Sequence, residues 1–315
     1  MTGAPIDDDQ PRASSFRTGW RALIALTDER DAARLVRALP PTVDPTRVSP
    51  ADAFAVAGDR SFQLIFADLA DAELLHGTGC EPRPQSPCPL LYLTTADSLE
   101  PRWPKVVRFR VRTLVDIELV DDPVLFEPIL ESTLGGLRID LQSLLGGAGS
   151  VTARTIDKES RRTDAVSEVL HRLQEFDPSQ LQLTHYRLVL EEILNNAMRH
   201  ASSAPPSHGT GGQEVGRSGG VDQIKLTSLV TPEVFAVNVT DGAGILTGEM
   251  VRNAISHQLA GEGDFDGSGR GLFIAYSLAN LLSVAVDPGQ RTDVLAIFRH
   301  ALPKEHKALI VNASA

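Results

Sequence analysis

The chain is poor in cysteine, in positive charge and in long apolar runs. Its 315 residues include two cysteines, and 41 acidic residues outnumber 30 basic ones, for a net charge of −11. Nucleic acid and anionic membranes repel an acidic chain, so we expect neither as a partner. No apolar run reaches the length of a membrane helix, and the acidic start of the chain is unlike the basic start of a signal peptide. We therefore expect a cytoplasmic protein.

The two cysteines, Cys80 and Cys88, lie in a proline-rich segment without a nearby histidine or further cysteine, so they form a poor metal site. The length and the 42% hydrophobic content predict two domains, each with its own core. The expected division is a disordered tail at 1–19, a first domain at 20–146, a second domain at 147–303 and a C-terminal tail at 304–315.

The first domain alternates between apolar runs and helical patterns. Near-continuous apolar runs at 22–28, 63–69 and 89–95 predict strands of a doubly wound parallel sheet covered on both faces. Polar residues that follow such strands gather at one edge of the sheet. The residues in that position are Asp28, Glu29, Asp68, Thr94 and Thr95. They are either a joint site or ordinary strand-ending polar residues.

This spacing resembles a response-regulator receiver domain. The resemblance implies that Asp68 is the phosphoacceptor, that Asp28 and Glu29 bind a metal, and that Thr94 or Thr95 is the switch residue. The Lys-Pro pair of that family would fall at Asp122-Pro123 here. A carboxylate in place of the cation would repel a phosphorylated aspartate, so a pseudo-receiver used for binding is an equal alternative.

Two further predictions concern the end of the first domain. Pro101 and Pro104 predict that no helix forms around them, and the alternation at 107–112 predicts a strand with an arginine face. A helix at 124–145 is expected to join the two domains.

Three separated segments of the second domain carry its chemistry: residues 192–196, 241–244 and 267–272. The first lies in a helical pattern that places Glu192 and Asn196 one turn apart on the polar side. A carboxylate there can orient an attacking hydroxyl, and an amide oxygen can ligate Mg²⁺.

The other two segments suit a nucleotide. The second segment follows an alternating strand at 234–239, so Asp241 stands at a strand end, where it can accept a hydrogen bond from the adenine amine. Gly242 and Gly244 allow the backbone to approach the base. The third segment opens an apolar helix at 272–282, and helix N-terminal amides bind phosphate.

The set, in this order, resembles the GHKL ATPase superfamily. The resemblance implies an α/β sandwich that binds ATP and Mg²⁺. Glu192 would be the catalytic carboxylate and Asn196 the magnesium ligand. The nucleotide would be held by residues of the second and third segments and of a later hairpin: Asp241, Gly244, Gly267, Gly269, Arg270, Gly271, Leu272 and Thr292.

Within the superfamily, the pattern Glu192, Asn196-Ala, His200 is similar to the first segment of anti-sigma-factor serine kinases. The resemblance implies transfer of the γ-phosphate to serine or threonine of an anti-sigma-antagonist-like partner, with a sigma factor as a second partner and a homodimer as the expected assembly. The alternatives are a non-catalytic ATP-binding adaptor or phosphorelay scaffold, and a histidine-kinase-like protein. His171 is the only candidate phosphoacceptor histidine, and its surroundings do not fit.

Two stretches depart from the superfamily. A Ser/Gly/Pro-rich insert at 202–221 is too polar to order itself. The presumed ATP lid at 245–266 lacks lysine and offers Arg252 and His257 as its cations, so turnover is expected to be slow.

Overall fold

The computed structural model describes most of the chain. The described residues are 19–53, 56, 62–76, 89–95, 99–136, 138–144, 150–156, 159–176, 178–203, 224–261 and 269–313. The predictions for the tail at 1–19, for the two cysteines and for the insert at 202–221 fall outside these residues, apart from Gly19 and the end of a helix at residue 203. None of the described helices is long and apolar enough to span a bilayer.

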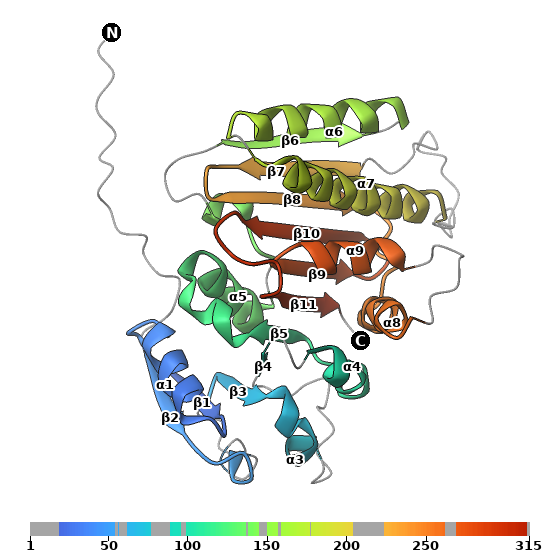
Figure 1. Cartoon of the computed structure of the whole chain (residues 1–315). Coiled ribbons are helices and arrows are strands. Elements are labelled where there is room, and N and C mark those ends of the chain that lie inside the picture. Colours follow the sequence, from blue (N-terminus) through green and yellow to red (C-terminus); the bar gives the residue numbers. More distant parts are fainter. Residues whose placement is uncertain are drawn as a thin grey trace, which may run out of the picture.

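One mixed sheet of eleven strands runs through the molecule, in the order β2-β1-β3-β4-β5-β11-β9-β10-β8-β7-β6 (Figure 1). The strands are β1 Trp20–Ala25, β2 Val43–Arg47, β3 Leu64–Asp68, β4 Leu90–Thr94, β5 Thr113–Asp116, β6 Ser150–Ile156, β7 Ile224–Val230, β8 Val234–Asp241, β9 Leu281–Asp287, β10 Arg291–Arg299 and β11 Ala308–Ala313.

Helices cover both faces of this sheet. The α-helices are α1 Glu29–Ala38, α3 Ala72–His76, α4 Leu99–Arg108, α5 Pro123–Gly135, α6 Glu159–Gln174, α7 Gln180–Ser203, α8 Gly248–Leu259 and α9 Arg270–Leu278. The 3₁₀ helices are η1 Leu69–Asp71, η3 Ile117–Asp121 and η4 Leu141–Leu144.

The N-terminal half contributes five parallel strands: β1, β3 and β4 lie at the three predicted apolar runs, and β2 and β5 are additional. The strands bury side chains on both faces, because α1 and α5 pack on one face while α3 and α4 pack on the other. The C-terminal half contributes an antiparallel run from β9 to β6. Helices α6, α7 and α9 cover one face of that run, and α5 and η4 reach its other face.

Half of the C-terminal tail predicted at 304–315 is instead a strand. β11 pairs antiparallel with β5 and parallel with β9, so it joins the two halves into one sheet. Leu309, Ile310 and Val311 are at most 1% exposed. The physical reason is that β11 is short and apolar on both faces, a pattern that alternation does not reveal at a chain end.

Helix α4 forms where the prolines predicted none, and no strand is found at 107–112. Pro101 lies in the first turn, where amides need no helical partner, so it costs nothing there. Pro104 costs one hydrogen bond, and burial of Trp103, Val106 and Phe109 on one side of the helix compensates for it.

The helix predicted at 124–145 is shorter in the structure. α5 ends at Gly135, and Gly136 follows in the left-handed conformation with φ of 59°. Glycine adopts this conformation without a Cβ clash, and it is a common helix end. The chain then turns into η4.

We expect the substitution Ile310→Ala to lower the free energy of unfolding by about 2–5 kcal/mol, because it leaves a cavity in the strand that joins the halves. Denaturant unfolding followed by circular dichroism measures this loss. The control is Leu181→Ala at a 64% exposed position of α7, for which a change within about 0.5 kcal/mol is expected. An Ile310→Ala protein as stable as the control would show that β11 is not structural.

Candidate functional site

Helix α7 carries the first segment. Its apolar side packs on the sheet through buried residues such as Leu190, Ile193 and Leu194, and this contact leaves Glu192 and Asn196 half-buried on the other side. The two side chains are one turn apart, as the sequence predicts. Arg199 donates a hydrogen bond to the Asn196 side-chain oxygen at 3.4 Å.

The start of α9 lies against this pair. A Cβ atom at Gly271 would stand 2.5 Å from Nδ2 of Asn196 and 3.1 Å from Oε2 of Glu192. A side chain at this position would displace the ends of the Asn196 and Glu192 side chains, so glycine allows the close approach. The structure therefore brings the first and third segments together, with the N-terminal turn of α9 beside the carboxylate and the amide.

Gly269 precedes this turn in a conformation that also favours glycine. Its φ is 88°, and a Cβ there would stand 2.7 Å from the Cβ of Ala254 on α8. Of the other residues predicted in the third segment, Leu272 is buried, Arg270 is exposed, and Gly267 falls outside the described residues. The third segment thus packs on both α7 and α8.

Asp241 ends β8 and lies directly across from Thr292 of β10. Asp241 is 3% exposed and Thr292 is fully buried. Burial raises the pKa of the Asp241 carboxyl, and the Ala243 amide, which donates to it at 2.9 Å, acts in the opposite direction. The Thr292 hydroxyl is near enough to favour the charged carboxylate, but it forms no regular hydrogen bond to it within the described residues.

Gly244 holds the second segment against the β9–β10 hairpin. Its φ is 57°, and a Cβ there would stand 2.3 Å from the backbone oxygen of Asp287. The Gly244 oxygen accepts a hydrogen bond from the Gly289 amide at 3.0 Å. This close approach fixes the loop after Asp241 beside the strand that carries Thr292.

His200 belongs to the same site, although the sequence pattern assigned it no role. It lies two turns beyond Glu192 on the same side of α7, and it is close enough to Asp241 for the carboxylate charge to influence its pKa. Burial lowers the pKa of His200, while Asp241 opposes that shift. The spacing of four residues from Glu192 to Asn196 and again to His200 is the signal that could have found it.

Arg252, predicted as a lid cation, has a different place. It is 7% exposed on α8 and donates to the Val111 oxygen at 3.3 Å. Its own backbone oxygen accepts a hydrogen bond from Nε1 of Trp103 at 3.3 Å. Arg252 therefore connects the two halves, and sequence reasoning missed both this role and that of Trp103.

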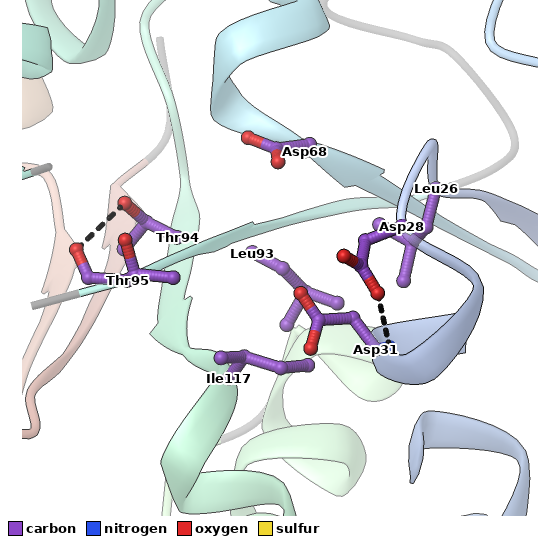
Figure 2. Close-up of a pocket in the computed structure, with 8 residues that line it drawn as sticks. All are labelled: Leu26, Asp28, Asp31, Asp68, Leu93, Thr94, Thr95 and Ile117. Carbon is purple, nitrogen blue, oxygen red and sulfur yellow. Dashed lines mark hydrogen bonds between the residues drawn. The ribbon is translucent and has the colours of Figure 1, made fainter. Parts of the chain in front are cut away.

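A second candidate site lies at the strand ends of the N-terminal half (Figure 2). We call it the acid pocket. Its lining residues are Leu26, Asp28, Asp31, Asp68, Leu93, Thr94, Thr95 and Ile117, around a cavity of about 20 Å³. Four of the five residues predicted for this edge of the sheet are thus together.

Glu29 is the fifth, and it points elsewhere. Its carboxylate pairs with Arg47 at 2.6 Å and is 81% exposed. Asp31, two residues further along α1, lies in the acid pocket instead, where burial and then the charge of Asp28 raise its pKa. Backbone amides of Asp31 and Arg30 lower the pKa of Asp28, which caps α1.

Asp122 does not face the acid pocket. β5 ends at Asp116, and Ile117 is the residue that lines the pocket beyond it. Asp122 lies on the far side of η3, caps α5 and pairs with Arg299 at 2.7 Å. The predicted repulsion between Asp122 and a phosphorylated Asp68 is therefore wrong, because the apolar run continues from β5 into η3 and hides the strand end.

Asp68 has a cationic partner from another direction. Nη1 of Arg102 on α4 lies 3.2 Å from Oδ1 of Asp68, which also accepts a hydrogen bond from the Ala70 amide. Among the described residues, no group of three or more histidine, cysteine, aspartate or glutamate side chains could hold a metal ion. Of the three carboxylates in the acid pocket, that of Asp68 is thus paired with an arginine.

Comparison with known proteins assigns the second domain. Residues 156–297 match the family model of the histidine kinase-like ATPase domain, which belongs to the GHKL superfamily. No curated protein matches the chain. The match spans all three segments and the hairpin with Thr292, and it indicates ATP binding and phosphotransfer. Residues 156–297 are thus similar to histidine kinase-like ATPase domains, and they lie within an α/β protein.

Proposed function

We propose that the protein binds ATP with Mg²⁺ and transfers the γ-phosphate to serine or threonine of a partner protein. One observation carries this proposal: the backbone at Gly271 lies against Glu192 and Asn196, so the N-terminal turn of α9 meets a carboxylate and an amide of the distant helix α7. Helix N-terminal amides, a carboxylate and an amide are the groups that phosphoryl transfer needs.

Each residue has a role that its surroundings support. Asn196 would hold Mg²⁺, which neutralises charge on the phosphates when it is bound. Glu192 would orient the attacking hydroxyl. Asp241 would accept a hydrogen bond from the adenine amine. The buried Thr292 hydroxyl, which has no regular partner within the described residues, fits a nucleotide or an ordered water beside that carboxylate.

The choice of serine or threonine rests on Glu192 and on α6. Histidine kinases usually carry asparagine at the place of Glu192. Helix α6 buries Val166, Val169 and Leu173 against the sheet and α7, so its apolar side is already occupied within the chain. An anti-sigma-antagonist-like substrate and a sigma factor are the proposed partners, with a homodimer as the proposed assembly.

A non-catalytic adaptor is the second candidate. The observation that favours it is the burial of Arg252 between the halves, which removes a cation expected near the phosphates. His257 remains as the predicted lid cation within the described part of α8. Arg199 on α7 and Arg270 at the start of α9 remain as arginines beside the Glu192–Asn196 pair.

For the N-terminal half, we propose a receiver-like regulatory domain. Five parallel strands in the order β2-β1-β3-β4-β5, with helices on both faces, support it, as does the gathering of Asp28, Asp68, Thr94 and Thr95 in the acid pocket. Asp68 would be the regulated carboxylate. Asp28 and Asp31, in place of Glu29, would be the nearby acids.

If Asp241 recognises the adenine amine, ATP and ADP should bind and GTP should not, because a carbonyl would face the carboxylate. Asp241→Asn should weaken ATP binding by about 1–3 kcal/mol. The control Asp287→Asn changes an exposed carboxylate at the end of β9 and should bind ATP as the wild type does. Calorimetric titration of the wild type and the two variants measures these affinities. Equal affinity of the wild type for ATP and GTP would contradict the role of Asp241.

Enzyme and adaptor differ in the response to Glu192→Gln. This change should leave the ATP affinity within about threefold and lower phosphate transfer by at least about 100-fold, because the amide cannot orient the hydroxyl as a base does. Asn196→Ala should weaken binding in the presence of Mg²⁺. Calorimetric titration measures ATP affinity, and transfer of labelled phosphate to proteins of a cell extract measures phosphate transfer. Wild-type protein that binds ATP without any transfer would favour the adaptor.

Treatment with acetyl phosphate and Mg²⁺ should modify Asp68 weakly or not at all. Arg102 already occupies one of its oxygens, the cavity is about 20 Å³, and the apolar Ile117 lines the pocket after β5, where it offers no cation to a phosphorylated aspartate. Intact mass measurement tests this, with Asp68→Asn as the control. Stoichiometric modification of the wild type that is absent from Asp68→Asn would show a working receiver.

A further inference from the structure

Helix α4 contacts the acid pocket through one side. Arg102 pairs with Asp68, as described above, and Nζ of Lys105 donates to the Ala70 oxygen in η1 at 2.8 Å. Both contacts reach the segment that directly follows β3. A change in the charge or the position of Asp68 therefore acts first on α4.

The next residue of α4 contacts the ATPase domain. Trp103 is 1% exposed, and its Nε1 donates to the Arg252 oxygen on α8 at 3.3 Å. Its ring centroid lies 5.2 Å from that of Tyr276 on α9. One side chain thus touches both helices that flank the third segment, and Figure 1 shows α4 beside α8.

From α8 and α9, packed contacts continue to the nucleotide site. Ala254 of α8 lies against Gly269, and Gly271 of α9 lies against Asn196. The glycines leave no room for a side chain between these elements, so each helix packs closely on its neighbour and a movement of α8 or α9 reaches the groups beside Glu192.

We propose that α4 couples the acid pocket to the ATP site, with Trp103 as the positioning residue for α8 and α9 and the Arg102–Asp68 pair as the contact that sets its place. The inference rests on the proposed ATP binding and adds its regulation. Coupling between two sites is reciprocal, so ATP must also act on the surroundings of Trp103.

The expected effect is bounded by the contact itself. The side chains of Arg102 and Asp68 are 32% and 36% exposed, and ion pairs of this exposure contribute little to stability. The ion pair can shift the equilibrium between two arrangements of α4 by no more than the free energy that the pair itself contributes. Breaking it should therefore raise the dissociation constant of ATP by about threefold to fivefold.

A double-mutant cycle tests the pair in the full-length protein. Arg102→Gln and Asp68→Asn should each raise the ATP dissociation constant about threefold to fivefold, and the double variant should be no weaker than either. Asparagine can still cap η1, so this change leaves the local backbone supported. The control is Arg108→Gln on the same helix, whose partner Glu73 lies 3.6 Å away at an exposed position.

Fluorescence gives the reciprocal measurement. In a Trp20→Phe protein, Trp103 is the sole tryptophan. Saturating ATP should change its emission, and Arg102→Gln should alter the size of that change, which a purely local role in stability would not do. ATP affinities equal to the wild type in the pair variants, or emission that ATP does not affect, would overturn the coupling. Wild-type protein that binds no ATP would overturn the proposed function as well.

Discussion

The insertion of β11 between β5 and β9 is the constraint on which the rest of the structure depends. Ile310 lies opposite Thr113 of β5 and Ser283 of β9, so the last strand of the chain supplies backbone hydrogen bonds to both halves. Domains joined only by a linker move relative to one another by default. Here a shared strand replaces the linker as the main connection, and both β5 and β9 lose an exposed edge.

Side chains around β11 strengthen the same junction. Asp122 of the N-terminal half and Arg299 of β10 form an ion pair in which both side chains are at most 13% exposed. Nζ of Lys307 donates to backbone oxygens at the end of α9, including that of Ser277 at 2.7 Å. Burial lowers the pKa of Lys307 to about 8. The helix whose first turn faces Glu192 is thus held at its other end by the residue before β11.

Much of the site could be predicted from the sequence, because local patterns determine it. Helical spacing placed Glu192 beside Asn196, and strand ends placed Asp68 near Thr94. The patterns failed where long-range contacts decide. Nothing near residue 310 indicates a partner strand some 200 residues away. Likewise, burial of Trp103 stabilises helix α4 although the helix contains Pro104. Whether Glu29 or Asp31 faces the acid pocket depends on how α1 is rotated about its axis, and Glu29 instead forms an ion pair with Arg47.

The place of Arg252 shows how the junction alters the chemistry of the site. A cation near a nucleotide is valuable because it stabilises phosphate charge. Burying it between the halves removes that contribution and gives the interface a donor for the Val111 oxygen instead. The N-terminal turn of α9, which carries Arg270, and Arg199 of α7 then supply positive potential beside Glu192 and Asn196. Because Trp103 of α4 packs against Tyr276, the N-terminal half supports the helix whose first turn lies beside Glu192 and Asn196.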